Sequence, residues 1–231
     1  MLKSKRIHDK FYIKEKIKVK DSFKFLFQEI KKLKFNSLID VGCSNGSFLN
    51  FLVQKYKKKE FVGADIDKEL ISIAEKKTKG IKYVKLDISK KITKNMKNKF
   101  DIVILSGVHT IYDNIEPLIK NTHSLCKKGG YLFLFGSFNP TNFDVITRVK
   151  KINSFIWETG FNRPSIISTK IILKRYFTSI KLKKFNFNLR VKENKKDPRR
   201  TYTIDLRSNK KITINGLEQV STKYLIYGKK K

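Results

Sequence analysis

The stretch Ser37–Gly46 reads SLIDVGCSNG, and it decides the fold. Its first part, Ser37–Val41, is a short run rich in β-branched residues, which predicts a strand that stops at Gly42. The residues Phe48–Tyr56 then show the apolar spacing of a helix. A strand, a glycine turn and a helix in this order indicate a parallel α/β sheet, whose ligands bind beyond the carboxyl ends of the strands.

The same alternation continues along the chain. Further strands are expected at Glu60–Asp65, Lys82–Asp87, Phe100–Leu105 and Tyr131–Phe135, with helices at Glu69–Lys77 and Ile115–Cys126. The glycine pair 129–130 is expected to close the second of these helices, because glycine is a frequent helix stop. Apolar strands that alternate with helices imply a parallel sheet covered on both faces.

The flanking regions extend this core. Before it, Phe23, Leu26, Phe27 and Ile30 recur on one face of a predicted helix. After it we expect a helix at Ser168–Tyr176, strands at Ile180–Phe185 and Thr222–Tyr227, and a hairpin of Thr201–Leu206 with Lys211–Ile214 around Ser208-Asn209.

The predicted fold is therefore α/β and Rossmann-like: a doubly wound, mostly parallel seven-stranded sheet with helices on both faces. An N-terminal helix and a small C-terminal hairpin insertion are added to it. We predict three parts: an N-terminal helical cap at 1–34, a core at 35–138, and strands at 139–231 that complete the sheet and elaborate the substrate side.

Composition excludes several classes of protein. With 231 residues and 40% apolar composition, one catalytic domain is the default. No apolar run approaches the roughly 20 residues that cross a bilayer, and Met1–Lys20 is too charged for a secretory signal, so a cytoplasmic location is expected. The cysteines Cys43 and Cys126 lie in different predicted elements with no metal-binding motif nearby, so neither a disulfide nor a metal site is expected.

The formal net charge of +33 has two readings. It could attract nucleic acid through its phosphates. However, only eight of the 53 basic residues are arginines, and the lysines accompany abundant asparagine and isoleucine, which favours biased codon usage. Arginine is the preferred reader of phosphates and bases because of its bidentate fork, so a specific nucleic-acid partner is not expected.

Polar and glycine residues directly follow four of the predicted strands. Asp40 and the glycines at 42 and 46 belong to the first turn, and Asp65 ends the second strand. A carboxylate there can accept hydrogen bonds from both hydroxyls of a ribose. Asp87 with Ile88 follows the third strand and suits an adenine ring, while Ser106 follows the fourth.

In this ordered set the chain resembles the class I S-adenosylmethionine-dependent methyltransferase family over roughly residues 35–138. The resemblance rests on LIDVGCSNGSFL, FVGADID, VKLDI, FDIVILSGVH and LCKKGGYLFLFG. It implies S-adenosylmethionine as the cofactor, with its methionine part on the first turn, its ribose on Asp65 and its adenine on Asp87 and Ile88. Ser44 departs from the family pattern, which has glycine there. The cofactor-binding residues expected in all are Asp40, Gly42, Cys43, Ser44, Gly46, Asp65, Ile66, Asp87, Ile88 and Ser106.

A dinucleotide enzyme is the rival interpretation of the glycine turn. Its fingerprint is G-x-G-x-x-G, which grips a pyrophosphate, whereas Gly42 and Gly46 are spaced G-x-x-x-G. The spacing therefore favours the methyltransferase.

The reaction expected is methyl transfer to a small molecule, most simply to an oxygen of a saccharide or related metabolite. For a hydroxyl acceptor a general base helps, and His109, just past the fourth strand, is the candidate. Trp157, Phe161 and Tyr176 are expected to line an acceptor pocket. The alternatives are an RNA methyltransferase and a cofactor-binding protein without transfer activity; no oligomeric state follows from the sequence.

Overall fold

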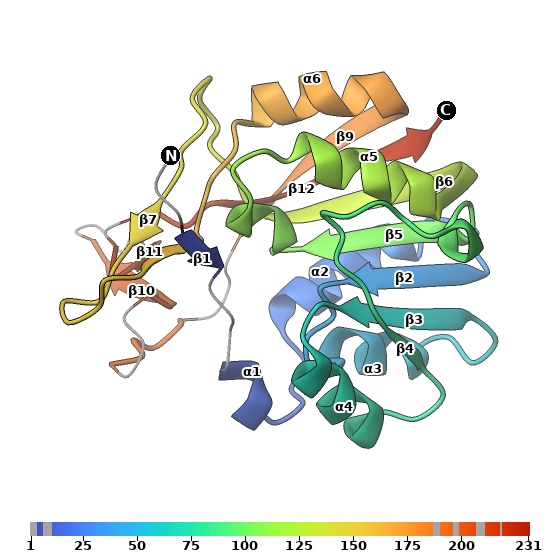
Figure 1. The fold of residues 1–231 in the computed structure, drawn as a ribbon, viewed down its shortest axis with the longest axis horizontal. Coiled ribbons are helices and arrows are strands. Elements are labelled where there is room, and N and C mark those ends of the chain that lie inside the picture. Colours follow the sequence, from blue (N-terminus) through green and yellow to red (C-terminus); the bar gives the residue numbers. More distant parts are fainter. Residues whose placement is uncertain (1–3, 7–10, 187–189, 196–198, 207–210, 218) are drawn as a thin grey trace.

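The structure is a computed structural model that describes all residues except 1–3, 7–10, 187–189, 196–198, 207–210 and 218. Its centre is one seven-stranded sheet of order β4-β3-β2-β5-β6-β12-β9 (Figure 1). The strands are β2 (Ser37–Val41), β3 (Glu60–Asp65), β4 (Lys82–Lys85), β5 (Phe100–Ser106), β6 (Cys126–Ser137), β9 (Phe177–Phe185) and β12 (Lys223–Lys230). The first five run parallel, and β12 pairs antiparallel with both β6 and β9. The predicted Rossmann-like, mostly parallel sheet is confirmed.

Helices cover both faces of the sheet. The helices are α2 (Asp21–Ile30), α3 (Ser47–Val53), α4 (Lys68–Lys77), α5 (Glu116–Leu125) and α6 (Ile166–Tyr176). Two apolar clusters divide along the two faces: one joins α2, α3 and α4 to Ile102 and Ile104 of β5, and the other joins α5 and α6 to Val103 and Leu105. Neighbouring residues of β5 thus pack on opposite faces, as the two-residue period of a strand requires.

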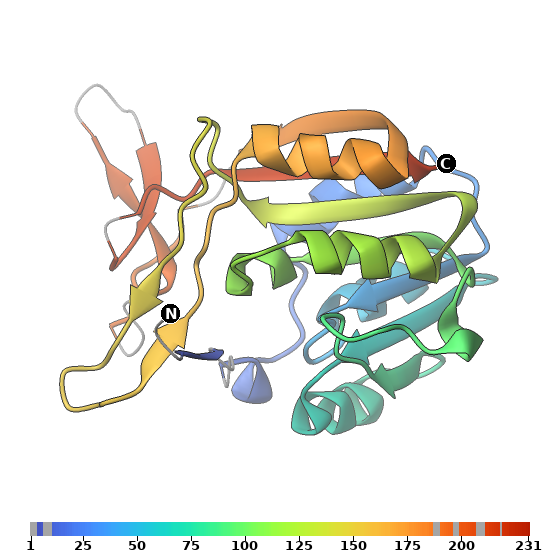
Figure 2. The same ribbon diagram turned by 45° about the horizontal axis from the view of Figure 1, so that its top comes forward.

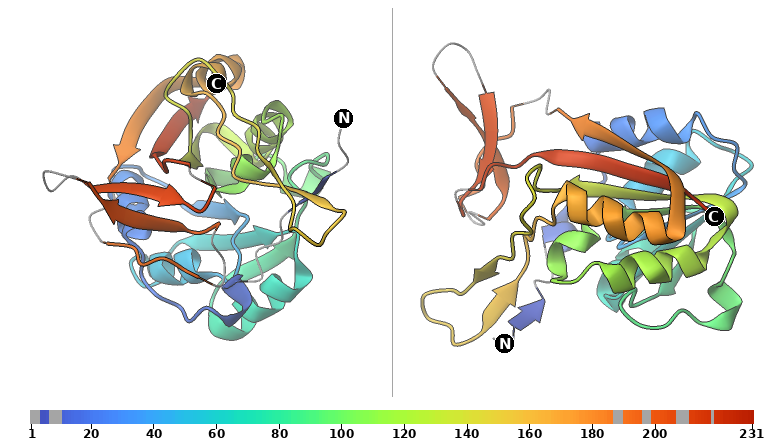
Figure 3. Two further views of the ribbon diagram at one scale, coloured as in Figure 1. Left: turned by 90° about the vertical axis from the view of Figure 1, so that its left-hand side faces the viewer. Right: turned by 90° about the horizontal axis from the view of Figure 1, so that it is seen from above.

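Smaller elements lie beyond the carboxyl ends of the parallel strands. They are β1 (Ser4–Arg6), α1 (Phe11–Lys14), the short helix η2 (Val108–Ile111), β7 (Arg148–Val149), β8 (Trp157–Thr159), β10 (Thr201–Asp205) and β11 (Lys211–Asn215). Strands β1, β8 and β7 form a small sheet, and β10 with β11 forms the expected hairpin. Figures 2 and 3 show both groups at the same end of the molecule. A further short helix, η1 (Lys94–Met96), precedes β5 at the other end. The turn expected at Ser208-Asn209 lies outside the described residues.

Two local expectations need correction. The N-terminal segment is not wholly helical, because Ser4–Arg6 pairs in parallel with Trp157–Thr159 of β8, a partner distant in sequence. The helix α5 ends at Leu125, before the glycine pair that was expected to close it. At Gly130 a Cβ would lie 2.8 Å from the Asp101 carbonyl oxygen, so this glycine instead lets the start of β6 approach β5.

Membrane-spanning helices and metal-binding clusters were not expected from the sequence. In the described part of the chain, no helix combines the length and apolar character needed to span a bilayer. The same described residues hold no group of three or more His, Cys, Asp or Glu side chains placed to bind a metal ion. The predicted boundaries at 34/35 and 138/139 remain predictions.

Candidate functional site

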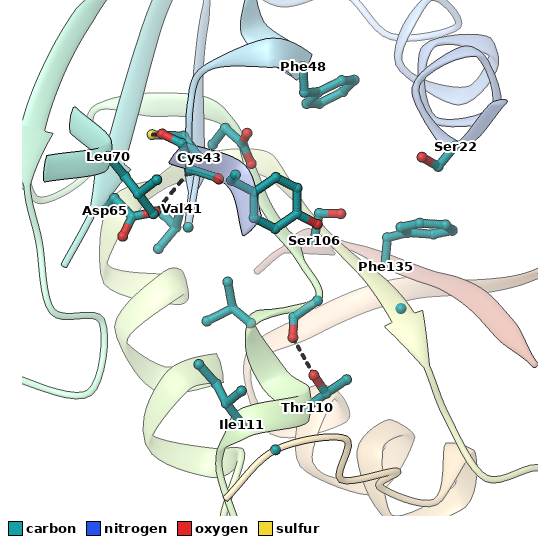
Figure 4. Close-up of a pocket in the computed structure, with 18 of the residues that line it drawn as sticks. Ser22, Val41, Cys43, Phe48, Asp65, Leu70, Ser106, Thr110, Ile111 and Phe135 are labelled. Atoms are coloured by element: carbon teal, nitrogen blue, oxygen red, sulfur yellow. Dashed lines mark hydrogen bonds between the residues drawn. The ribbon is translucent and has the colours of Figure 1, made fainter. Parts of the chain in front are cut away.

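A cavity of about 530 Å³ lies beyond the carboxyl ends of the parallel strands (Figure 4). It adjoins β2 and β5, between which the order of the sheet reverses, and open α/β sheets bind their ligands at such a position. Most residues expected to hold the cofactor line this cavity, namely Asp40, Gly42, Cys43, Ser44, Asp65, Ile66, Asp87, Ile88 and Ser106. Gly46 does not line it. A Cβ at Gly46 would lie 2.4 Å from the Tyr83 hydroxyl, so that glycine permits close packing at the start of α3.

The loop after β2 is held against the end of β3. The backbone N–H groups of Gly42 and Cys43 both donate to the Ala64 carbonyl oxygen, at 2.7 and 3.0 Å. Gly42 has a φ of +80°, and a Cβ there would lie 2.3 Å from Cγ2 of Val108. Ser44 has a φ of +54°, so the position where the family has glycine also adopts the left-handed conformation here. The loop therefore has left-handed backbone at Ser44, a conformation that glycine adopts more readily than serine.

Asp65 joins the two loops that follow β2 and β3. Its Oδ2 accepts a hydrogen bond from Ser44 N at 2.9 Å, drawn in Figure 4, and its Oδ1 accepts one from Asp67 N at 3.0 Å. Each carboxylate oxygen can accept a second hydrogen bond. The Asp65 side chain thus has a fixed orientation in the cavity lining, and its two oxygens can accept further hydrogen bonds from a pair of hydroxyl groups.

Asp40 is a buried carboxylate whose ionised form is disfavoured in the free protein. It is 3% exposed, and no group in the described part of the chain donates a hydrogen bond to its Oδ1. Burial, together with the nearby charge of Asp65, raises the pKa of Asp40 to about 7. A buried acceptor without a partner at the wall of a cavity is suited to a cationic or hydrogen-bonding ligand.

Asp87 and Ile88 lie together after β4, as expected. The Oδ1 of Asp87 accepts hydrogen bonds from Ser89 N (3.0 Å) and Ser89 Oγ (2.6 Å), which hold the turn. Ile88 is 3% exposed and belongs to the apolar cluster beneath the cavity. The pair combines a fixed carboxylate with an apolar surface.

The N-terminal segment completes one wall of the cavity, which the sequence did not predict. Asn45 Nδ2 donates to the carbonyl oxygens of Tyr12 (3.1 Å) and Glu15 (3.4 Å), and Tyr12 lines the cavity. Asn45 is 1% exposed and its Oδ1 also accepts from Ser47 Oγ at 2.6 Å. The position of Asn45 inside the glycine-rich stretch could have indicated that it lies at the cavity. No sequence pattern indicated this for Tyr12.

Aromatic and basic residues also line the cavity. Phe48 and Phe135 lie on one side of the space in Figure 4, with Ile111 of η2 across from them. Of the three aromatic residues expected at the acceptor, only Phe161 lines the cavity. Trp157 lies in β8 beneath Lys150, and Tyr176 packs against His123. Four basic residues, Lys20, Arg199, Arg200 and Lys223, line the same cavity.

His109 does not line the cavity, although its neighbours Val108 and Thr110 do. The ring is 1% exposed and stacks on Phe138 with 4.4 Å between ring centroids. Its Nε2 lies 3.2 Å from the Ser137 carbonyl oxygen, and burial lowers its pKa to about 4. A general base must come within hydrogen-bond reach of the acceptor proton, so this geometry does not support the role expected for His109.

With this geometry established, comparisons with known proteins identify the family. A family model described as a methyltransferase domain matches residues 39–132. The ubiquinone biosynthesis O-methyltransferase of Pelagibacter ubique is 30% identical over 190 residues, which cover 77% of this chain and 75% of that protein. The chain belongs to the class I S-adenosylmethionine-dependent methyltransferase family.

Solved structures show the same fold. The YcgJ protein of Bacillus subtilis superposes with a TM-score of 0.62 at 11% identity, covering 91% of this chain and 98% of that one. An S-adenosylmethionine-dependent methyltransferase of Methanosarcina mazei gives a TM-score of 0.60 at 14% identity, covering 88% and 96%. At such identities these likenesses concern the fold alone.

Two further relatives match over a shorter stretch. The tRNA (guanine-N(7)-)-methyltransferase of Clostridium botulinum is 28% identical over 119 residues, and a protein of Invertebrate iridescent virus 6 is 23% identical over 121 residues. The chain spans about half the length of these relatives, 52% and 44% respectively.

Replacing Asp65 with alanine is expected to weaken binding of S-adenosylmethionine. The variant loses charged acceptors for the ribose hydroxyls, which at about 1.5–3 kcal/mol corresponds to roughly 10–150-fold in the dissociation constant measured by calorimetry. Glu69→Ala is the matched control. Glu69 is an exposed carboxylate that does not line the cavity, so we expect near-normal affinity. Equal affinities in Asp65→Ala and the unaltered protein would disprove the ribose role.

Replacing His109 with phenylalanine is expected to leave turnover within a few-fold of the unaltered protein. A phenyl ring keeps the stack on Phe138 and removes both ring nitrogens. Loss of a true general base would lower turnover by about 10²–10⁴-fold, a difference that a steady-state assay resolves easily. A fall of that size with cofactor affinity unchanged would restore His109 as the base.

Proposed function

We propose that this chain transfers the methyl group of S-adenosylmethionine to an oxygen of a small-molecule acceptor, a saccharide or a related metabolite. The observation that carries the proposal is the continuity of one cavity. Carboxylates at the carboxyl ends of β2, β3 and β4 line it, and so do aromatic and basic residues from other parts of the chain. Donor and acceptor can therefore share one cavity.

The residues present fit the cofactor. Asp65 supplies acceptors for the ribose, and Ile88 with the carboxylate of Asp87 supplies an apolar surface and an acceptor for the adenine. The buried Oδ1 of Asp40 supplies an acceptor for the ammonium group of the methionine part. The positive φ values at Gly42 and Ser44 turn the loop backbone along this part of the cavity.

When bound, S-adenosylmethionine would supply an activated methyl group for transfer to the acceptor oxygen, with the bonding electron pair staying on the departing thioether and the proton of the hydroxyl passing to solvent water. The protein contributes by holding the two reactants in line, which alone can supply about 7–11 kcal/mol of the barrier. Phe48, Phe135 and Phe161 line the acceptor end and reduce the access of water during the transfer.

The relatives favour a small acceptor. The ubiquinone biosynthesis O-methyltransferase matches 77% of this chain, including residues beyond the cofactor core, whereas the tRNA methyltransferase matches 48%. The name of the ubiquinone biosynthesis O-methyltransferase supports the proposal of an oxygen acceptor. Methylation of RNA is the second candidate, since the net charge of +33 and the tRNA-modifying relative both favour it.

The cytoplasmic location expected from the sequence stays a prediction.

Cofactor binding is expected to release a proton from Asp40. Because its folded pKa is raised to about 7, Asp40 is largely protonated below that pH in the free protein. A bound ammonium group favours the ionised form, so affinity should rise with pH up to about 7 and then level off. Calorimetry at about pH 6 in two buffers of different ionisation enthalpy measures the proton directly. Asp40→Asn should abolish both effects, and pH-independent affinity in the unaltered protein would contradict the assignment.

Transfer itself is tested with the purified protein and isotopically labelled S-adenosylmethionine. The acceptors are monosaccharides, nucleotide sugars, a dihydroxybenzene and a tRNA pool, at about 150 mM salt so that exposed charges are screened beyond about 8 Å. We expect label on a small-molecule oxygen. Label on a defined RNA position alone would establish the second candidate, and tight cofactor binding with no product from any acceptor would favour a binding protein.

A further inference from the structure

The loop between β7 and β8 carries large apolar side chains that face solvent. Ile152 is 96% exposed, Phe155 is 99% exposed and Ile156 is 56% exposed. The hairpin formed by these two strands projects from the rest of the molecule in Figures 1 and 2, and residues 150–156 are called the hairpin tip below. Single exposed apolar residues are ordinary on a protein surface. Three of them within five positions at the end of a projecting hairpin indicate a surface that a partner covers.

The shape of the hairpin tip is fixed by its own hydrogen bonds. Ser154 N donates to the Lys151 carbonyl oxygen at 3.0 Å, and Ser154 Oγ accepts from Ile156 N at 3.0 Å. At the base of the hairpin, Arg148 Nη1 donates to Thr159 Oγ1 at 2.8 Å, between residues that are paired in register across β7 and β8. The apolar side chains are therefore presented to solvent by an ordered backbone, which lowers the entropy that binding costs.

The charge around the hairpin tip is positive. Lys150 and Lys151 begin the tip and are exposed, and no acidic residue occurs from position 145 to position 157. Glu158, the next acidic residue along the chain, pairs with Arg199 at 2.8 Å. Apolar side chains beside lysines are the combination that binds the interface of a bilayer containing anionic lipids.

Trp157 directly follows the hairpin tip and is the single tryptophan of the chain. Lys150 Nζ lies 5.4 Å from the centroid of its ring, so a cation and an indole stand together where the tip joins the strands. Tryptophan is enriched at the headgroup layer of membranes, because its ring is apolar while its N–H group is polar. Apolar residues at the end of the hairpin, with tryptophan and lysine at its base, match the change from acyl chains to headgroups.

We propose that the hairpin tip docks this protein on the surface of an anionic lipid bilayer. Ile152, Phe155 and Ile156 enter the boundary between headgroups and acyl chains, and the lysines lie at the lipid phosphates. Gly160 and Phe161 directly follow β8 and line the cavity, so the docking element is joined to the candidate site. Docking goes beyond the proposed methyl transfer and does not depend on it.

A second copy of the chain is a poorer occupant of the hairpin tip. A stable protein interface buries about 1,200–2,000 Å² in total, whereas a projecting tip offers only a few side chains to a facing protein surface. Two copies also carry a formal net charge of +33 each and repel one another. A bilayer surrounds an inserted tip, and anionic lipids are attracted by the same charge.

The test is binding of the full chain to lipid vesicles, measured by sedimentation at about 150 mM salt so that long-range attraction is screened. One set of vesicles contains phosphatidylcholine alone, and the other contains about a quarter phosphatidylglycerol. A third set has the anionic composition with brominated acyl chains, which quench tryptophan fluorescence on contact. We expect binding to the anionic vesicles, a shift of the Trp157 emission to shorter wavelength, and quenching by the brominated lipid.

The fluorescence of Trp157 distinguishes docking through the tip from adhesion through other lysines. Because the chain has one tryptophan, quenching reports whether the hairpin itself meets the acyl chains. Protein that sediments with anionic vesicles while Trp157 stays unquenched would be bound through another basic face, and this would overturn the proposal.

Substitutions in the hairpin tip test the apolar contribution. Ile152→Ser and Phe155→Ser should each weaken binding to anionic vesicles by roughly 10–100-fold, the factor that corresponds to burying such a side chain. Both side chains are almost fully exposed, so their loss should leave the fold and the binding of S-adenosylmethionine unchanged. Ile171→Ser is the matched control, because Ile171 is 54% exposed on α6, outside the tip, and it should bind vesicles as the unaltered protein does.

A second pair of variants tests the charge. Lys151→Gln should weaken binding to anionic vesicles by about fivefold, whereas Lys58→Gln, which removes an exposed lysine before β3, should have little effect. Absence of vesicle binding, or equal effects of Ile152→Ser and Ile171→Ser, would overturn the proposal. A dimer that Phe155→Ser dissociates, in a protein that binds no vesicles, would assign the tip to a second copy instead. Failure to methylate any acceptor would remove the proposed function and leave docking standing.

Discussion

The attachment of the loop after β2 to the end of β3 is the contact on which the cavity depends. Two backbone hydrogen bonds to the Ala64 carbonyl oxygen and one to the Asp65 carboxylate leave the loop little freedom. The loop can follow this path because Gly42 and Ser44 adopt positive φ values. Asp65 therefore does two things at once: it closes the loop, and the same hydrogen bonds orient its remaining lone pairs toward the cavity.

The same arrangement has an electrostatic cost. Asp40 and Asp65 end neighbouring parallel strands, and burial with mutual repulsion raises the pKa of Asp40. A carboxyl group whose folded pKa is raised favours folding in its protonated form, so that contribution is complete below its usual pKa and is lost as pH rises toward about 7. Asp40 therefore contributes less to the stability of the free protein at neutral pH than it does in acid. A cationic ligand offsets that cost, which is how a binding site differs from a core position.

The elements that could be predicted from the sequence are those determined by local residue patterns. The strand that ends at Asp65 and the turn at Gly42 were predictable because parallel strands are apolar throughout and stop at glycine or acidic residues. The helix end at Leu125 was not, because the glycines at 129 and 130 serve a close approach to β5 that only the tertiary structure reveals. His109 illustrates the same limit: its position after β5 was predicted correctly, but whether its ring turns toward the cavity or toward Phe138 depends on packing.

The residues that line the cavity come from different parts of the chain, and this explains why the family is recognisable from sequence while the acceptor is not. The acidic lining residues lie within residues 39–132, the stretch that the methyltransferase family model matches. The basic lining residues come from outside it, since Lys20 precedes that stretch and Arg199, Arg200 and Lys223 follow it. Residues far apart in sequence that meet only in the fold leave no local motif, so no pattern around Arg199 or Lys223 announces a site. A constant cofactor must preserve one set of contacts, whereas the segments that hold the acceptor can change without disturbing the sheet.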